Sequence, residues 1–488
     1  MIQHIKNYFS ASIVINILSI CLLPIFTRYL TPGDFGIIAI YMMFGSLATN
    51  FISISIHSAT YRYYFKDKNE FPALNFSNLV FVFIVFIVFG LFVWIKSENI
   101  SQHIFDNKVS SKLIIISYIG GCIAYFYNYF KELLIYQNRS KEYAIITILT
   151  GLINPLLALI FIFYFSLTYL ARIYGIIFAQ LLVFALIVYL QREYFRIEFS
   201  KILLKKSIKF SYPQLPSGLI SLTQKSFDKT MLTNLKNLDV VGHYQLGQKL
   251  GSVGKNLISA IGRSWVPYFM KNAEINSEKS KSKILDRYYE IITIYNYLCI
   301  AICFFAEETV KVFTTREFYP SMYIIPIYVT YILITHVIGA LCKPQITYAE
   351  KLNFTLPAPA IAVMINIIAN LILIPSYGAI GAMIATLISG SVSSIIWYYF
   401  GQKAYPLPIK INFIIKQLIL YVIFIIIVYY LMFHDFHFLS KVLLKCFFLL
   451  FYFYLSIRFG FIKKERVIYF YSLIKRNSLS FLPNQEKK

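Results

Sequence analysis

The sequence predicts an all-α integral membrane protein that crosses the bilayer about fourteen times. Hydrophobic residues make up 58% of the 488 positions, and the mean hydropathy is +0.65. Soluble domains are roughly 45–50% apolar, so a water-soluble chain of this composition could not cover its apolar surface. The second observation is that apolar runs of about 20 residues recur, separated by loops that are alternately rich and poor in Lys and Arg.

Each expected span contains the roughly 20 mostly apolar residues that a helix needs to cross the hydrocarbon core. The segment 211–235 is the least apolar, and hydropathy alone would leave it doubtful. The connections are short, so we expect no soluble domain between spans. The expected spans are 8–28, 36–57, 77–95, 113–136, 143–165, 172–190, 211–235, 242–270, 288–310, 323–345, 353–374, 379–400, 412–433 and 439–457.

Basic residues set the expected orientation. With the N-terminus in the cytoplasm, the cytoplasmic loops collect about 30 of the 46 Lys and Arg residues and the outer loops about nine. Because Lys and Arg are retained on the cytoplasmic side, this alternation places both chain ends there. A missed or additional span would scramble the alternation.

The formal net charge is +24, from 46 Lys and Arg against 22 Asp and Glu. In a soluble protein this excess would indicate nucleic acid. Here the aromatic residues lie in long apolar runs rather than between basic residues, so we assign the excess to topology and expect no nucleic-acid partner. The six cysteines fall within apolar segments and are expected to be small core residues, and we predict no metal site.

The basic loop 191–210 separates the first six expected spans from the last eight. Phe195, Phe199, Ile202 and Leu203 alternate with cations in it. This pattern predicts an amphipathic segment that lies on the inner leaflet. A plain solvated linker is the alternative.

Seven cations lie inside expected spans rather than in loops. A charge at a helix centre costs about 2.5–3.5 kcal/mol even on insertion scales. Five of the seven lie in the spans 211–235 and 242–270, so lipid exposure would cost on the order of 10 kcal/mol. They must face protein or water, and the seven are Lys131, Lys225, Lys229, Lys249, Lys255, Arg263 and Lys445.

Span 211–235 carries three charges on one face, because Lys225, Asp228 and Lys229 are spaced i, i+3 and i+4. We expect Asp228 to pair with Lys225 or Lys229. A cationic wall of this kind suits an anionic cargo such as a pyrophosphate. The alternative is that these residues form internal ion pairs.

Span 242–270 continues the expected wall. Lys255 lies about as deep as Lys225, and Lys249 and Arg263 fall on nearly the same helix face. Lys249 and Arg263 are also candidates to snorkel towards the interface. Arg28 and Arg62, at the ends of the first two spans, could line the same cavity or serve as interface anchors.

Two pairs near helix ends are candidates for a gate or for ion coupling. Lys131 and Glu132 lie near the inner end of span 113–136, where a local ion pair is the alternative. Glu307 and Glu308 lie near the outer end of span 288–310. Adjacent side chains on a helix point about 100° apart, which favours a solvated rim over one shared site.

Four junctions carry recognisable motifs. They are Arg28-Tyr-Leu-Thr-Pro-Gly-Asp-Phe-Gly36, Ser226-Phe-Asp228-Lys229-Thr-Met-Leu232, Val241-Gly242-His-Tyr244-Gln-Leu-Gly-Gln-Lys-Leu250 and Asn366-Ile-Ile-Ala-Asn370-Leu-Ile-Leu-Ile-Pro375-Ser-Tyr377-Gly378-Ala-Ile-Gly381-Ala382. In physical terms Pro and Gly end one span, and Asp34 can cap the next. We expect these motifs to shape turns, and the residues concerned are Pro32, Gly33, Asp34, Gly36, Asn366, Asn370, Pro375, Gly378 and Gly381.

In order and content these junctions resemble those of Wzx-type oligosaccharide-lipid flippases. That group belongs to the MOP superfamily, which also holds MATE drug exporters and MurJ lipid II flippases. The second motif departs from the family pattern, with Lys229 where the family has Arg. The resemblance implies a MATE/MurJ-like bundle of two six-helix lobes plus two C-terminal helices. The implied domains are an N-lobe at 1–190, the linker at 191–210, a C-lobe at 211–400, the last two spans at 401–460 and a basic cytoplasmic tail at 461–488.

The resemblance also implies a function. The cargo would be an undecaprenyl-pyrophosphate-linked oligosaccharide, moved from the inner to the outer leaflet of a bacterial inner membrane for O-antigen, capsule or exopolysaccharide assembly. Partners would be membrane lipids and the polysaccharide polymerase machinery. No cofactor is expected, and coupling to H⁺ or Na⁺ stays open.

Three alternatives stay open. A MATE-like multidrug exporter would need acidic spans for cationic drugs, whereas the charges within these spans are mostly basic. A lipid II flippase fits the junction motifs less well. A membrane polysaccharide polymerase or ligase would be an enzyme with a long outer loop carrying catalytic Arg or His, and the loop at 96–112 holds no such cluster. We therefore expect a transporter and not an enzyme.

Overall fold

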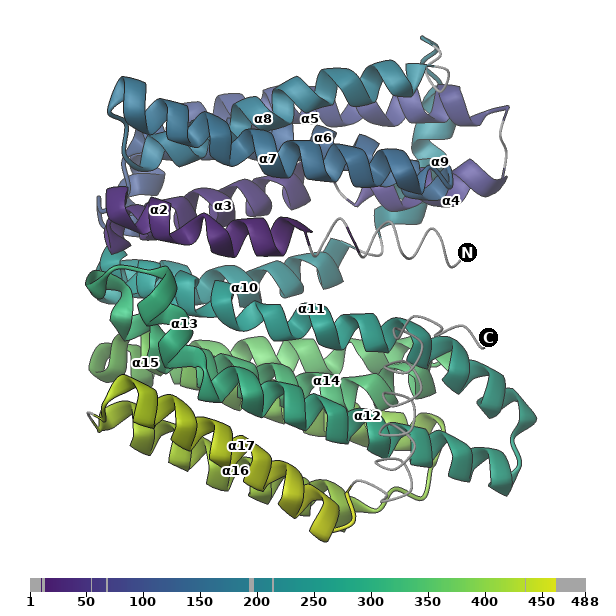
Figure 1. The fold of residues 1–488 in the computed structure, drawn as a ribbon. Coiled ribbons are helices and arrows are strands. Elements are labelled where there is room, and N and C mark those ends of the chain that lie inside the picture. Colours follow the sequence, from purple (N-terminus) through teal and green to yellow (C-terminus); the bar gives the residue numbers. More distant parts are fainter. Residues whose placement is uncertain are drawn as a thin grey trace, which may run out of the picture. The chain divides into compact units, whose positions relative to one another are not determined.

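The structure is a computed structural model that describes residues 10, 14–53, 55–66, 69–192, 197–212, 215–434 and 436–461. Within these ranges all regular structure is helical and no strand occurs. The chain divides into two compact units, and each is described by itself (Figure 1). The predicted all-α membrane fold is confirmed.

Unit 1 comprises residues 1–253, 309–328 and 356–393. Close packing of α3 on α6 depends on glycine, because a Cβ on Gly121 would lie 2.6 Å from the Gly45 carbonyl oxygen. The helices wholly within unit 1 are α2 (Leu23–Tyr29), α3 (Pro32–Ser53), α4 (Ile56–Lys66), α5 (Phe71–Phe105), α6 (Ser111–Tyr136), α7 (Ser140–Phe165), α8 (Tyr169–Leu190), α9 (Lys201–Ser211) and α10 (Leu215–Leu235).

Unit 2 comprises residues 254–308, 329–355 and 394–488. Buried aromatic rings fill its core, and the Trp265 ring packs against those of Phe269 and Tyr288. The helices that lie wholly or partly within it are α11 (Leu238–Ile275), α12 (Glu278–Phe304), α13 (Ala306–Phe313), α14 (Ile324–Tyr348), α15 (Pro357–Ala404), α16 (Ile411–Phe433) and α17 (Phe438–Arg458).

The two C-terminal helices are joined to the rest of unit 2 by polar side chains. Asn296 of α12 donates a hydrogen bond to the Gln417 side chain of α16 at 3.0 Å. Gln417 in turn donates to Thr293 of α12 at 2.7 Å. All three side chains are buried, and side-chain hydrogen bonds of this kind are a common means of helix association in membranes.

Each expected span overlaps a helix, but not every helix meets a simple test of length and hydropathy. Eight described helices are long and apolar enough to cross a membrane, or nine if α12 and α13, which meet at a 47° bend, form one span. The difference from fourteen arises at α2, α3, α10 and α11, and at α15, which covers two expected spans. Gly378 breaks α15 with φ +54°, as the Pro-x-Tyr-Gly motif predicts. The count of fourteen therefore stays a prediction.

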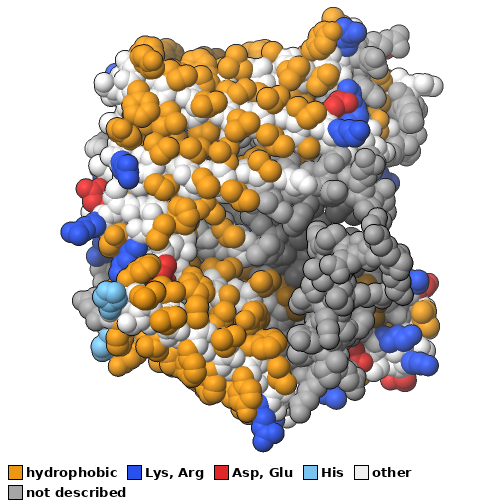
Figure 2. Space-filling model, viewed as in Figure 1, with side chains coloured by type: hydrophobic (Ala, Val, Ile, Leu, Met, Phe, Trp, Pro, Cys, Tyr) orange, Lys and Arg blue, Asp and Glu red, His pale blue; other side chains and the backbone are white. Residues whose placement is uncertain are grey.

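The outer surfaces of the helices are apolar. Figure 2 shows hydrophobic side chains spread along the helices of one face, with charged side chains mainly near helix ends. Trp94 and Ile95 on α5 are 63% and 67% exposed, and Ile426 on α16 is 64% exposed. A surface of this kind requires lipid rather than water, so the chain is a multi-pass membrane protein.

The expected amphipathic linker contains a helix. Ser200 caps α9, its side chain accepting a hydrogen bond from the Leu203 amide. Leu203 is buried beside Ala73 and Leu74, whereas Ile202 is 81% exposed. Phe195 lies outside the described residues. Contact of this segment with the inner leaflet stays a prediction.

The first motif forms a turn as predicted, but Pro32, Gly33 and Asp34 belong to the first turn of α3 rather than preceding it. The Thr31 hydroxyl accepts a hydrogen bond from the Asp34 amide. The Asp34 carboxylate accepts hydrogen bonds from the Thr31 amide at 2.9 Å and the Thr31 hydroxyl at 3.0 Å. The glycines of the first and third motifs also meet. A Cβ on Gly36 would lie 2.0 Å from the Leu238 carbonyl oxygen, and one on Gly242 would lie 1.9 Å from the Pro32 carbonyl oxygen. These glycines therefore let α3 and α11 touch backbone to backbone.

Candidate functional site

Only some of the predicted cationic side chains lie among the described residues. Lys229 on α10 and Lys249 on α11 are half-buried within unit 1, and Lys255 is exposed within unit 2. Lys225 and Arg263 belong to α10 and α11, but their side chains lie outside the described residues. The predicted wall along α10 and α11 is therefore neither confirmed nor contradicted as a whole.

The two predicted arginines lie at helix ends. Arg28 is exposed in the last turn of α2. Arg62 on α4 is exposed, and its guanidinium carbon lies 5.3 Å from the centre of the Phe210 ring of α9. This cation–π contact attaches the linker helix to α4. A role for either arginine in cargo binding stays a prediction.

A third cation joins Lys229 and Lys249 in unit 1. Arg172, in the first turn of α8, is close enough to Lys249 for the two charges to repel each other. Its guanidinium carbon lies 4.3 Å from the centre of the Phe26 ring. Among the described residues, none of these three cations has a carboxylate within 4 Å. Sequence reasoning missed Arg172 because a cation at the end of a span normally marks the interface.

The sequence predicts that Asp228 pairs with Lys225 or Lys229. Its carboxylate lies more than 4 Å from the Lys229 ammonium, although the two charges still attract each other, and the Lys225 side chain lies outside the described residues. The Asp228 carboxylate instead accepts hydrogen bonds from three neutral donors: the Tyr244 hydroxyl at 2.6 Å, the Asn370 amide at 2.6 Å and the Thr386 hydroxyl at 2.8 Å. Asp228 is only 4% exposed. Hydrogen bonds to an ionised acceptor are roughly twice as strong as neutral ones, so these donors can stabilise a buried carboxylate without a paired cation.

The Asn366–Asn370 motif is part of this polar cluster, where the sequence assigned it to turn formation. Asn370 also donates to the Asn366 side-chain oxygen at 3.1 Å, and both residues are at most 1% exposed. The Asn370 side-chain oxygen has no hydrogen-bond partner among the described residues. Carboxylate, amide and hydroxyl oxygens are the ligands that hard cations prefer, so the cluster could hold a monovalent cation or a proton. Among the described residues no group of three or more His, Cys, Asp or Glu side chains forms a metal site.

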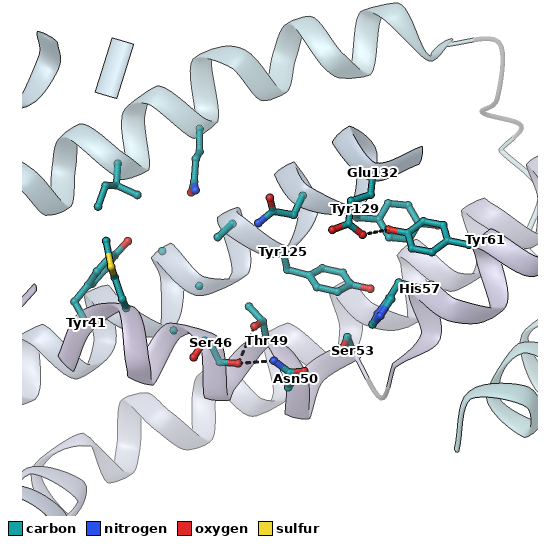
Figure 3. Close-up of a pocket in the computed structure, with 18 residues that line it drawn as sticks. Tyr41, Ser46, Thr49, Asn50, Ser53, His57, Tyr61, Tyr125, Tyr129 and Glu132 are labelled. Atoms are coloured by element: carbon teal, nitrogen blue, oxygen red, sulfur yellow. Dashed lines mark hydrogen bonds between the residues drawn. The ribbon is translucent and has the colours of Figure 1, made fainter. Parts of the chain in front are cut away.

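A cavity of about 380 Å³ lies in unit 1 among α3, α4, α6 and α8 (Figure 3). Tyr41, Asn50, Tyr125 and Gln180 are among the residues that line it. The described lining residues include no Lys or Arg and one carboxylate, that of Glu132. Its volume falls within the range of small-molecule sites.

Glu132, predicted as half of a gating pair, lines this cavity. Its carboxylate accepts a hydrogen bond from the Tyr61 hydroxyl at 2.8 Å. The Lys131 side chain instead makes cation–π contacts. Its ammonium nitrogen lies 4.8 Å from the centre of the Tyr127 ring and 5.9 Å from that of the Tyr143 ring. The two neighbours thus do not form the local ion pair that was the alternative.

Glu307 and Glu308, in the first turn of α13, form a buried ion cluster with α17. The Lys445 ammonium lies 3.0 Å from a Glu307 oxygen and 2.6 Å from a Glu308 oxygen, and Lys441 lies 2.8 Å from Glu307. Glu307 is 2% exposed and Lys445 fully buried, so the solvated rim favoured from helix geometry is wrong for Glu307. The chain bends by 47° between α12 and α13, and a single ammonium can still bridge two carboxylates 100° apart. Ion coupling here stays a prediction.

The comparisons with known proteins agree with this architecture. Residues 3–273 match the family model "Polysaccharide biosynthesis protein". No curated protein matches the chain. Among solved structures, the chain resembles the lipid II flippase MurJ in an inward closed conformation, with a TM-score of 0.71, 16% identity, and 93% of this chain and 98% of that chain covered.

A second solved structure is an inward-facing multidrug resistance MATE family transporter of the MOP superfamily. The TM-score is 0.61 at 14% identity, with 80% of this chain and 93% of that chain covered. At these identities the likeness shows the fold, and the predicted MATE/MurJ-like fold of the MOP superfamily is confirmed. The fold is one that the MurJ flippase and this MATE transporter share. Because the family model covers more than half of its length, the chain belongs to the polysaccharide biosynthesis protein family.

Proposed function

We propose that the protein is a flippase for undecaprenyl-pyrophosphate-linked oligosaccharide repeat units. It moves them by alternating access from the cytoplasmic to the outer leaflet of a bacterial inner membrane, for surface polysaccharide assembly. The observation that carries this proposal is that Arg172 of α8 and Lys249 of α11 lie close enough for their charges to repel each other within unit 1. Lys229 of α10 is a third cation in the same unit, and none of the three has a described carboxylate within 4 Å.

Three such cations are costly without a partner. A cation at a helix centre costs about 2.5–3.5 kcal/mol on insertion scales. Arg172 lies nearer a helix end, but its repulsion with Lys249 adds to the cost of both charges. A pyrophosphate offers oxygens that accept hydrogen bonds from guanidinium and ammonium groups, and its negative charge offsets the repulsion. Binding of an anionic lipid head group offsets this cost, and so accounts for the presence of three cations within the helices of unit 1.

The alternatives fit the described residues less well. A cationic drug would be repelled by the same group of cations. A lipid II flippase would share the pyrophosphate chemistry, but the family model that matches is that of polysaccharide biosynthesis. The fold shared with the MurJ flippase and a MATE transporter favours transport over a polymerase or ligase.

Movement and coupling complete the proposal. Two lobes, formed by the spans of residues 1–190 and 211–400, would alternately open the cation group to each side. A proton or a Na⁺ ion at the Asp228 cluster would supply the coupling, because Asp228 is a buried carboxylate next to Lys229 in the sequence and no described cation lies within 4 Å of it.

A deletion experiment tests the proposal in the bacterium that carries the chain. Loss of the gene should remove surface polysaccharide and leave lipid-linked repeat units accumulated in the inner leaflet. The wild-type gene should restore export, whereas Arg172→Gln and Lys249→Gln should not, at equal protein level. Lys112→Gln is the matched control, because Lys112 is an exposed cation of unit 1. Normal export from the Arg172→Gln/Lys249→Gln double variant would overturn the proposal, and so would altered drug susceptibility with intact polysaccharide in the deletion strain.

A further inference from the structure

The cavity in unit 1 differs in chemistry from the cation group. Most polar residues that line it are uncharged, and among the described ones Lys and Arg are absent. They come from four helices, and Figure 3 shows the side chains of Asn50, Tyr125 and Glu132 converging on the cavity. A phosphate would find no counter-charge here.

The helix α3 supplies a row of hydrogen-bond acceptors. The Ser46 hydroxyl donates to the Met43 carbonyl at 2.8 Å, and the Thr49 hydroxyl and the Asn50 amide donate to the Ser46 carbonyl at 2.9 and 2.8 Å (Figure 3). Because these donors are used within the helix, the side-chain oxygens remain to accept hydrogen bonds from a ligand.

The helices α6 and α8 add groups without partners. The Tyr125 hydroxyl and the Gln180 side-chain oxygen are both buried, and neither has a hydrogen-bond partner among the described residues. The Glu132 carboxylate accepts one hydrogen bond, from Tyr61, and can accept more. A buried polar group left unsatisfied costs about 1–3 kcal/mol, so a ligand that supplies several hydroxyl donors would be favoured.

Aromatic rings at one end of the cavity are fixed in place. The Tyr61 ring stacks on that of Tyr136, with centroids 4.3 Å apart and planes 17° apart, and lies 6.3 Å from the ring of Tyr129. The Tyr129 hydroxyl is also held in place, because it donates to the Asn75 side-chain oxygen and lies 3.1 Å from the Thr60 hydroxyl oxygen. Rigid tyrosine faces offer an apolar surface of the kind against which the C–H face of a sugar ring can pack.

From this combination we propose that the cavity binds an uncharged sugar of the lipid-linked oligosaccharide, as a subsite separate from the cations that hold the pyrophosphate. The acceptor-rich wall matches sugar hydroxyls, the tyrosines match the sugar ring, and Glu132 disfavours a sugar that carries a carboxylate or phosphate. An organic cation would satisfy Glu132 but would leave most of the acceptors unpaired. The inference rests on the proposed function and adds which part of the cargo binds in unit 1.

Photo-crosslinking in cells that make the native cargo tests this subsite. The photoreactive residue p-benzoylphenylalanine replaces Tyr125 in one variant and Met42, an exposed lining residue, in a second. Phe163, which is 56% exposed on α7, is the matched position outside the cavity. Only variants that restore surface polysaccharide are irradiated. If the variant at Tyr125 does not restore it, the variant at Met42 is used alone. We expect adducts that contain the sugar-bearing lipid at 42 or 125 and only phospholipid adducts at 163.

A substitution at Glu132 and a further crosslinking position at Phe26 separate the possible outcomes. Glu132→Gln removes the charge that accepts sugar hydroxyls, so it should lower the yield of the sugar adduct at 42 about tenfold. The photoreactive residue at Phe26, whose ring lies beside Arg172, reports on the pyrophosphate end. Sugar-lipid adducts at 26 but not at 42 or 125 would overturn the subsite and leave the flippase intact. Absence of sugar-lipid adducts at all three positions would overturn both. Adducts with organic cations, or with lipid that lacks sugar, at 42 and 125 would also overturn the subsite.

Discussion

The Asp228 carboxylate and the Asn370 side-chain amide lie 2.6 Å apart, although 142 positions separate them in the sequence. Their hydrogen bond joins α10 to α15 inside the apolar interior of unit 1. Tyr244 and Thr386 extend the same cluster to α11 and to the part of α15 beyond Gly378. One carboxylate thus connects four helical segments, which leads to the first prediction.

Asp228→Asn should destabilise the protein. The substitution keeps the side-chain volume, but an amide places its own N–H donors against those of Asn370, Tyr244 and Thr386. Each donor left unpaired costs about 1–3 kcal/mol. We expect the apparent unfolding temperature of the purified chain to fall by several degrees. Asp106→Asn is the control, because Asp106 is exposed and its backbone is in the left-handed region that Asn tolerates. Equal unfolding temperatures for both variants would contradict this account of the cluster.

Gly36→Ala and Gly242→Ala should each impair folding. The added Cβ atoms would meet the Leu238 and Pro32 carbonyl oxygens at 2.0 and 1.9 Å, so α3 and α11 must separate. Overpacking of this kind typically costs about 1–3 kcal/mol. Gly339→Ala is the comparison, because a Cβ there would meet its nearest neighbour at 3.7 Å. Detergent-solubilised fluorescence size-exclusion profiles should show less monodisperse protein for the first two variants only. Profiles unchanged from wild type would mean that the two helices do not touch.

Lys445→Met should strongly destabilise unit 2. It leaves the half-buried Glu308 and the buried Glu307 without the Lys445 cation, and breaking a buried ion pair costs about 3–5 kcal/mol. The double variant Lys445→Met/Glu308→Gln keeps the Lys441–Glu307 pair and removes the uncompensated charge, so it should recover part of the loss. Lys416→Met, at an exposed lysine of α16, is the control. Thermal unfolding of the four proteins measures the coupling. If the double variant is no more stable than Lys445→Met, the ions do not act as a cluster.

A disulfide between α3 and α11 should stop transport. A Cβ on Gly33 would lie 3.8 Å from the Asp239 Cγ, so the side chains of the pair Gly33→Cys/Asp239→Cys should meet and can be joined by oxidation. The exposed Cys21 and Cys446 are first replaced by Ala. Oxidation should abolish export in cells and reduction should restore it, because alternating access requires this end to open. The two single-cysteine proteins should be insensitive to oxidant. Undiminished export by the fully crosslinked protein would exclude opening between Gly33 and Asp239.

The fold could be predicted because its signals are local. Apolar runs and basic loops identified the long helices but not α4, and Pro375 and Gly378 marked the break in α15. Span 211–235 was doubtful by hydropathy for a physical reason: α10 carries Lys225, Asp228 and Lys229, and it does not meet the apolar test that α5 and α8 meet. The polar face of α10 is stabilised by hydrogen bonds within the protein, and a hydropathy scale does not include such contacts.

The sites were harder to predict because their parts lie far apart in the sequence. Asn366 and Asn370 looked like turn residues, and only the fold brings them to Asp228. Tyr61 donates a hydrogen bond to Glu132, 71 positions away, and lines the cavity, and only the fold brings the two together. A search for charges within spans could not find a cavity made mostly of neutral side chains. A search for uncharged polar residues repeated on one face of α3 could have found Ser46, Thr49 and Asn50.

The most direct test of the central claim is transport by the purified full chain in proteoliposomes. The vesicles contain lipid-linked oligosaccharide extracted from the source bacterium, and a membrane-impermeant periodate reagent oxidises the sugars that it can reach. With the wild-type protein, nearly the whole pool should become accessible. With empty vesicles, or with Arg172→Gln/Lys249→Gln, only the outer-leaflet pool should react. If the wild-type protein leaves the inner pool protected, or if the double variant transports as fast as wild type, then the protein is not a flippase that works through these cations.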